Sequence, residues 1–235
     1  TVTGDNMTWS AVYTMTSNDT DKCSRLLMSP NTDLIQLATH PVTIIDTTNS
    51  SAVWFDKTPP TLSSVTIASN NSVSTMAKTD DNITLSFTSA EAIQTPTVTI
   101  AGHDVTETGD NRTWSAAYTM KDNDTEKSVS LNISFSDLAG NAGIAVTSTI
   151  GGSAVLFDKT PPKLEGVTEF TTPSADNETI YTFNSDEAGT INYGGGCSSS
   201  DNSTSGGDKE ITFDALVDGT YDNCTISVTD NASNT

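Results

Sequence analysis

Aspartates occur at matching places in different parts of this 235-residue chain, and their side chains could bind a metal ion. Four of them form the candidate set: Asp56, Asp158, Asp137 and Asp230. The first two lie in two copies of Phe-Asp-Lys-Thr-Pro-Pro, and the other two lie in loops, as do the further candidates Asp122 and Asp124. Calcium takes six to eight oxygen ligands from carboxylates and carbonyls, so an acidic joint suits Ca²⁺. Aspartate also caps turns through its own backbone, and this alternative stays open.

Two cysteines in the C-terminal part of the chain are candidates for a disulfide. Cys197 follows a predicted strand and a glycine run, whereas Cys224 lies inside the strand after an Asp-Gly-x-Tyr turn. These places can face each other in a sandwich, so we predict a bond that adds roughly 3 kcal/mol in the loop-entropy description. Such a bond implies an oxidising compartment. Cys23 is left unpaired and has no neighbouring base that would make it a nucleophile.

No set of catalytic side chains stands out. The two histidines, His40 and His103, join no Ser/His/Asp or Cys/His set within one repeat, and no glycine-rich loop precedes a helix. Asp186 and Glu187 are adjacent on a predicted strand, where neighbouring side chains face opposite ways, so they are not expected to act together on a glycosidic bond. We therefore predict that the protein is not an enzyme, and that Trp114 packs in a core instead of binding sugar.

The composition argues against two classes of partner. The formal net charge is −20, which repels nucleic acid and anionic membrane surfaces. No apolar run approaches the ~20 residues of a membrane span, so we expect no membrane insertion in this segment. Asn-x-Ser/Thr sequons recur, for example at Asn82, Asn111, Asn132 and Asn177. In a chain this rich in Asn, Ser and Thr, composition accounts for most of them, and the sequence alone does not indicate glycosylation.

The two hexapeptides, at residues 55–60 and 157–162, are predicted domain joints. Each ends an apolar run and precedes a stretch in which apolar and polar residues alternate. Adjacent prolines fix φ and remove two backbone donors, which excludes a helix or the interior of a strand. The spacing of 102 residues matches a small β-sandwich domain. We predict the C-terminal half of a repeat at 1–57, a complete domain at 58–159, and a domain lacking its last strand at 160–235.

Alternating patterns predict an all-β fold with about seven strands in a complete unit. The expected strands of the middle unit are 62–68, 83–88, 97–100, 114–120, 129–135, 145–149 and 153–157. Those of the last unit are 179–184, 190–193, 210–213 and 224–229. Residues 22–45 do not fit, because they have the wrong period and lack the expected Gly-Asn turn. Either this segment has diverged or the reading frame changes there, and in both cases we expect poor order.

The joints, the Asp-Gly-x-Tyr turn at 218–221 and the Asp-x-Ala-Gly-Asn loop at 137–141 resemble bacterial Ig-like domain repeats of large surface or adhesin-type proteins. The resemblance implies tandem Greek-key β-sandwiches joined by short Pro-Pro linkers, and an extracellular or cell-surface location. Its partners would be neighbouring repeats and an unidentified surface ligand, and no cofactor would be required beyond calcium at the joints. The predicted function is that of a structural spacer. The alternatives are a module that binds carbohydrate or protein, and accessory domains of a secreted glycan-active enzyme.

Overall fold

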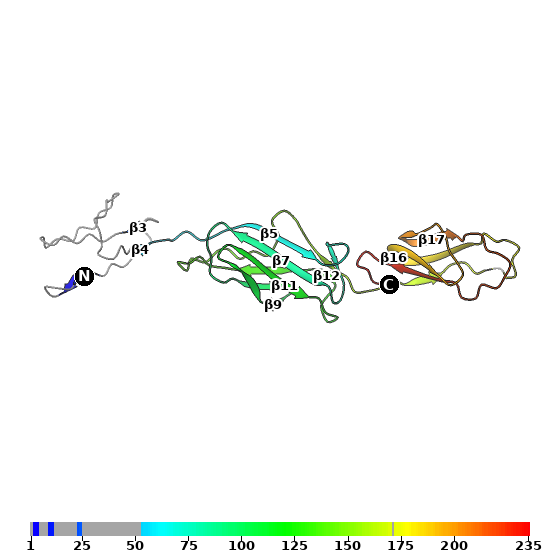
Figure 1. Cartoon of the computed structure of the whole chain (residues 1–235), viewed down its shortest axis with the longest axis horizontal. Helices are drawn as coiled ribbons and strands as arrows, with labels where there is room; N and C mark the ends of the chain where they lie inside the picture. Colours follow the sequence, from blue (N-terminus) through cyan, green and yellow to red (C-terminus); the bar gives the residue numbers. More distant parts are fainter. Residues whose placement is uncertain (1, 5–8, 12–22, 25–52, 171) are drawn as a thin grey trace.

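A computed structural model of the chain describes residues 2–4, 9–11, 23–24, 53–170 and 172–235 (Figure 1). In these residues every regular element is a strand and none is a helix. The sheets are antiparallel except for one short parallel pair, β6 with β14. The predicted all-β class is therefore confirmed. Residues 22–45 lie outside the described residues, apart from Cys23 and Ser24, so the expectation of poor order there is untested.

The strands before residue 160 are β1 (Val2–Gly4), β2 (Trp9–Ala11), β3 (Cys23–Ser24), β4 (Val53–Trp54), β5 (Leu62–Ser69), β6 (Met76–Ala77), β7 (Asn82–Ser89), β8 (Thr97–Ile100), β9 (His103–Val105), β10 (Glu107–Asp110), β11 (Thr113–Thr119), β12 (Lys127–Ser128), β13 (Leu131–Ser134) and β14 (Leu156–Phe157). Those after it are β15 (Leu164–Gly166), β16 (Ile180–Gly194), β17 (Ser203–Thr212) and β18 (Thr225–Thr229). Residues 55–61 and 158–163, which contain the proline pairs, belong to no strand.

The segment 58–159 contains three sheets around one core, an arrangement consistent with a β-sandwich. Their strand orders are β10-β11-β7-β5, β13-β8-β9 and β12-β14-β6. Strand β7 lies between β5 and β11, and its Phe87 is level with Val65 on one side and Trp114 on the other. Side chains along β7 alternate between outward and buried, as a strand with one covered face requires.

The core of this segment draws apolar side chains from all three sheets. Its fully buried members include Val65, Ile83, Leu85, Phe87, Ile93, Val98, Ile100, Met120, Ile133 and Phe157. Trp114 belongs to the same cluster and is only 8% exposed, as predicted. Gly109 on β10 lies opposite Trp114, and a Cβ there would come within 2.9 Å of the tryptophan ring. Close packing between these two strands therefore depends on the absence of a side chain at 109.

The segment 160–235 has a separate, smaller core. Its sheet has the order β15-β16-β17, with β18 also pairing with the second half of β16. The core consists of Phe183, Ile191, Cys197, Ile211, Phe213 and Val228. The predicted Cys197–Cys224 disulfide is present, with the two Cα atoms 5.4 Å apart, and it links the residues after β16 to the start of β18. The oxidising compartment that it implies stays a prediction.

Five of the predicted strands differ from the structure. Residues 145–149 contribute only an isolated bridge, Val146 with Ile133, and 153–157 is strand only at β14. In the C-terminal segment, β16 is one continuous strand that bends at a bulge after Ser185, where we predicted two. Strand β17 begins at Ser203, although its first half is polar and glycine-rich. Pairing with β16 along its full length outweighs the weak local preference of that half.

Candidate functional site

The structure brings three carboxylates together at each of two equivalent places. The first cluster contains Asp56, Glu91 and Asp137, with one oxygen of each within 4.8 Å of the others. Asp56 comes from the joint before the segment 58–159, Glu91 follows β7, and Asp137 follows β13. Asp137 is only 1% exposed, whereas the other two are half-buried. The joint aspartate thus lies against the unit that follows it.

The second cluster repeats this arrangement about one hundred residues later. It contains Asp158 from the second joint, Glu187 at the bulge of β16, and Asp230 directly after β18, again within 4.8 Å. Asp230 is buried, and Asp158 and Glu187 are half-buried. Two independent stretches of sequence therefore fold into the same constellation.

An asparagine four residues after each buried aspartate ties the loop to the joint. Asn141 donates its backbone N–H and its side-chain Nδ2 to the Asp137 carboxylate at 2.8 and 2.7 Å, and Nδ2 also donates to the backbone oxygen of Asp56 at 3.0 Å. Asn234 makes the same three bonds, to Asp230 at 2.9 and 2.8 Å and to the backbone oxygen of Asp158 at 3.1 Å. One amide side chain thus links a loop at the end of each segment to the hexapeptide that precedes that segment.

The two glutamates occur in matching Ser-x-Glu-Ala turns, Ser89 to Ala92 and Ser185 to Ala188. In each turn the buried serine hydroxyl donates to the backbone oxygen of the glutamate, which fixes the direction of the chain. The sequence prediction named the four aspartates of the two clusters but missed both glutamates. Their shared tetrapeptide was the available signal, because it recurs just after a long alternating strand in both segments.

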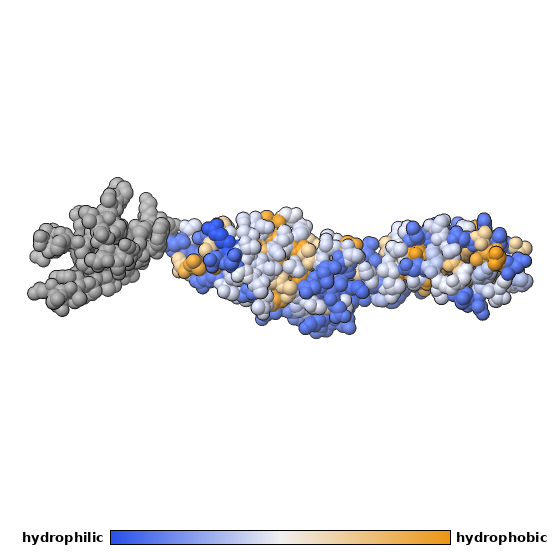
Figure 2. Space-filling model, viewed as in Figure 1, coloured by the Kyte–Doolittle hydropathy of each residue, from blue (hydrophilic) through white to orange (hydrophobic). Residues whose placement is uncertain are grey.

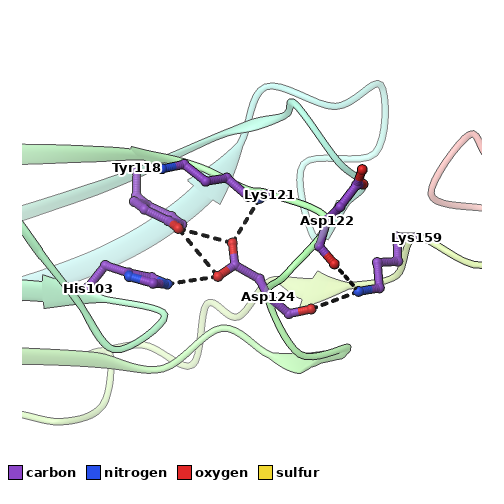
Figure 3. A network of polar contacts seen from close by, with 6 residues as sticks. All are labelled: His103, Tyr118, Lys121, Asp122, Asp124 and Lys159. Atoms are coloured by element: carbon purple, nitrogen blue, oxygen red, sulfur yellow. Dashed lines mark hydrogen bonds and ion pairs between the residues drawn. The ribbon is translucent and has the colours of Figure 1, made fainter.

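The other two predicted aspartates lie in a different network (Figure 3). Asp124 accepts hydrogen bonds from His103 Nε2 at 2.8 Å, from the Tyr118 hydroxyl at 3.1 Å and from the Lys121 backbone N–H at 2.8 Å. The ring of His103 stacks on Tyr118 with centroids 4.7 Å apart. Asp122 accepts a bond from the Thr79 hydroxyl. These two aspartates therefore stabilise a loop and do not join the carboxylate clusters. His103 starts β9 and pairs with Asp124.

The loop that contains Asp122 and Asp124, drawn in Figure 3, also forms hydrogen bonds with the second joint, residues 157–162. The ammonium of Lys159 donates to the backbone oxygens of Asp122 and Asp124. The Glu126 carboxylate accepts bonds from the Lys159 backbone N–H at 2.8 Å and from the Thr160 hydroxyl at 2.7 Å. Together with the bond from Asn234 to Asp158, these contacts attach the joint to the segments on both of its sides.

Two further contacts join the segments directly. Asn71, in the loop after β5, donates Nδ2 to the backbone oxygen of Ala232 at 2.8 Å, and the Ser72 and Ser233 hydroxyls are 3.4 Å apart. Figure 1 accordingly shows the C-terminus beside the loops that end the middle segment. The loop from Asp230 to Asn234 therefore contacts both the joint and the preceding unit.

The negatively charged carboxylates of the second cluster repel one another. Burial raises the pKa of Glu187, and the charges of Asp158 and Asp230 raise it further. Burial also raises the pKa of Asp158, and Asp230 adds to this effect, although a hydrogen bond from the Thr160 N–H opposes it. A divalent cation would relieve this repulsion, and hard carboxylate oxygens are what calcium prefers. The residues present therefore fit Ca²⁺, with Asp158, Glu187 and Asp230 holding one ion and Asp56, Glu91 and Asp137 another.

Comparison with known proteins adds no assignment: no protein-family model matches this chain, and no curated protein matches it significantly. Among the described residues, no helix is long and apolar enough to cross a membrane. The functional conclusion therefore depends on the joint geometry.

We predict opposite titration behaviour for two groups of carboxylates. Burial alone would raise the pKa of Asp124 and Asp137, but hydrogen bonds outweigh it and lower both below the usual 3.8. Their stabilising contribution is present above that value and is lost as the pH falls through the lowered pKa. For Asp158 and Glu187 the raised pKa means that stability is lost as the pH rises through it.

Carboxyl-carbon NMR in calcium-free buffer measures these titrations directly. We expect Asp158 and Glu187 to titrate above their usual 3.8 and 4.5, and Asp124 and Asp137 below 3.8. If all four titrated at their ordinary values, the burial and hydrogen bonding described above would be wrong.

Proposed function

We propose that this chain is a non-enzymatic spacer segment of a repetitive extracellular surface protein of the adhesin type, built from tandem Ig-like sandwiches with short Pro-Pro linkers. Its role is to hold something else away from a cell surface. The observation that carries this proposal is the repeated joint: in two places the backbone oxygen of the joint aspartate accepts a hydrogen bond from an asparagine of the following segment, and that asparagine also donates to a buried aspartate of the same segment. A spacer needs joints of this kind, because each joint limits the bending between one unit and the next.

The proline pairs, hydrogen bonds and carboxylates at the joints support a chain of segments that bends little. Pro59-Pro60 and Pro161-Pro162 restrict the backbone, and Lys159 and Asn234 attach the second joint to both neighbours. Calcium would add a further cross-link, because each carboxylate cluster combines one residue of the joint with two of the following unit. The net charge of −20 keeps neighbouring copies apart in solution. In this proposal the acidic residues have two effects, repulsion between molecules and cation binding within one.

Isothermal titration of calcium into the full chain tests the role of the clusters. We expect two bound ions for the two clusters, and a loss of both when Glu91→Gln and Glu187→Gln are combined. Removal of even a supporting residue typically costs about 10- to 100-fold in metal affinity, so loss of a ligand should cost at least as much. Asp110→Asn is the matched control, because Asp110 is an exposed acidic residue of the β10–β11 turn outside both clusters. Unchanged binding in the double variant would exclude the clusters as calcium sites.

A second candidate function is ligand binding by the C-terminal segment. Phe170 is 52% exposed and stacks on Tyr181 with ring centroids 4.8 Å apart, and the apolar side chains of Val167 and Ile180 are also exposed in this segment. On the face shown in Figure 2, apolar residues occur as separate patches among hydrophilic ones, including one at the far end of this segment. The exposed ring of Phe170, stacked on the half-buried Tyr181, is a surface that a carbohydrate or protein ligand would use. Binding to a panel of glycans that Phe170→Ala abolishes, without change in the melting temperature, would favour this function over the spacer.

A further inference from the structure

The asparagines of this protein fall into two groups that differ in how they use the side-chain nitrogen. In the described residues, four asparagines are followed at the second position by a residue other than Ser or Thr: Asn71, Asn141, Asn184 and Asn192. Every one of them donates Nδ2 to an acceptor in the fold. All but Asn184 donate two such bonds, so both of their amide hydrogens are used. These asparagines are structural.

The asparagines that start Asn-x-Ser/Thr sequons behave differently. The structure describes nine of them: Asn70, Asn82, Asn111, Asn123, Asn132, Asn177, Asn202, Asn223 and Asn231. Within the described part of the chain, none of these nine donates a hydrogen bond through Nδ2. Where their side chains are used, the oxygen accepts instead: Asn70 Oδ1 from the Asn82 N–H at 2.7 Å, and Asn223 Oδ1 from the Gly196 N–H at 3.2 Å. The side-chain nitrogen therefore stays available in each of these nine described sequons, and it is the atom to which a glycan is attached.

The exposure of the sequon asparagines and the number of sequons in the sequence also indicate that these residues differ from the structural asparagines. Eight of the nine side chains are exposed, and the exception, Asn132, is half-buried in β13. Over the whole sequence, twelve of eighteen asparagines start a sequon, while Ser and Thr together make up 70 of 235 residues. Random placement of those residues would give about five sequons. The expectation that composition accounts for most of the sequons is therefore wrong, and the described asparagines also differ in their Nδ2 bonding according to whether they start a sequon.

We propose that the exposed sequon asparagines are sites of N-linked glycosylation. The co-reactant is a glycosyl donor activated by a lipid-linked pyrophosphate. In the transfer, the bond between the sugar C1 and the pyrophosphate oxygen breaks and a bond between Nδ2 and C1 forms. The lipid-linked pyrophosphate leaves with the bonding electrons, and Nδ2 releases one proton to solvent. One amide hydrogen remains on Nδ2, and the side-chain oxygen stays free to accept, as in Asn70 and Asn223. This proposal is independent of calcium and of the spacer function.

The test is glycopeptide mass spectrometry, with electron-transfer fragmentation, of the full chain recovered from the cells that make it. This method places the added mass on a residue whatever the sugar is. We expect sugar on the exposed sequons, including Asn111, Asn123 and Asn177. We expect none on the structural group of asparagines.

Three variants produced in the same cells make the test specific. Thr125→Ala should remove the modification of Asn123, whereas Thr125→Ser should retain it. Neither change should disturb the fold, because the exposed Thr125 side chain makes no hydrogen bond with any described residue. Val73→Thr creates a new sequon at Asn71, whose Nδ2 is held by Asp81 at 2.7 Å and by Ala232. Val73 is itself 43% exposed, so the change should be tolerated, and Asn71 should stay unmodified.

Two outcomes would overturn the proposal. One is the absence of sugar from every exposed sequon of the native chain. The other is modification of Asn71 in the Val73→Thr variant to the same extent as Asn123, since sequon identity alone would then decide the site and the free nitrogen would have no role.

Discussion

Replacing Asp137 with alanine is expected to destabilise the segment 58–159 by about 2–3 kcal/mol. The carboxylate is 1% exposed and accepts the backbone and side-chain N–H groups of Asn141 at 2.8 and 2.7 Å. Without it, buried donors lose a charged acceptor, and such losses cost more than the removal of an exposed bond. The same change removes one carboxylate of the first cluster, so calcium should no longer stabilise this end of the segment.

Chemical denaturation of the full chain, with calcium or with chelator, measures both effects. Asp110→Ala is the control, because this exposed turn residue should change stability by no more than about 0.5 kcal/mol. An equal, small effect of the two substitutions would show that Asp137 is a solvated acid with no structural role.

Loss of the disulfide is expected to destabilise the segment 160–235 by about 3 kcal/mol, by the loop-entropy estimate for cysteines 27 residues apart. Cys197 belongs to the small core of this segment, and Cys224 packs against that core. Because the core has only six buried members, the cross-link is a large part of what holds it. The paired change Cys197→Ala and Cys224→Ala should therefore lower the melting temperature of this segment strongly.

Calorimetry of the full chain should resolve a separate unfolding transition for each of the two segments, because each has its own core. The disulfide lies in only one of them. The transition of the segment 58–159 serves as the internal control and should not move. A double alanine variant in which both transitions stayed at their original temperatures would contradict the assigned role of the bond.

Strands with regular alternation could be predicted from the sequence, and the others could not. β5, β7, β8 and β11 follow alternating apolar residues and lie close to their predicted limits. The first half of β17 is polar and glycine-rich, so its strand conformation comes from pairing with β16 and has no local signal. The strands β6, β9 and β12 have two or three residues each, too few to show a period.

The candidate site could be predicted only in part, because local motifs reveal single residues but not which of them meet in the fold. Asp137 and Asp230 sit in recurring Asp-x-Ala-x-Asn loops, and Asp56 and Asp158 sit in recurring joints, so local motifs revealed these four. Which joint meets which loop depends on the tertiary fold. Glu91 and Glu187 approach only because the turn after β7 and the bulge of β16 lie at the same end of the sheet as the joint. No local pattern shows that proximity.

We propose that the joint between the segments 58–159 and 160–235 is rigid and that calcium makes it more rigid. Spin labels on exposed sites, one at Ala117 in β11 and one at Glu210 in β17, measure the distance between the two segments by double electron–electron resonance on the full chain. Cys23 is first replaced by serine, and the labels are attached through unnatural amino acids so that the disulfide stays intact. We expect a single peak of inter-label distances in chelator, a narrower distribution when calcium is added, and a broader one in the Asn234→Ala variant. A broad distribution that neither calcium nor Asn234→Ala alters would contradict this proposal, because the two segments would then move freely about Pro161-Pro162.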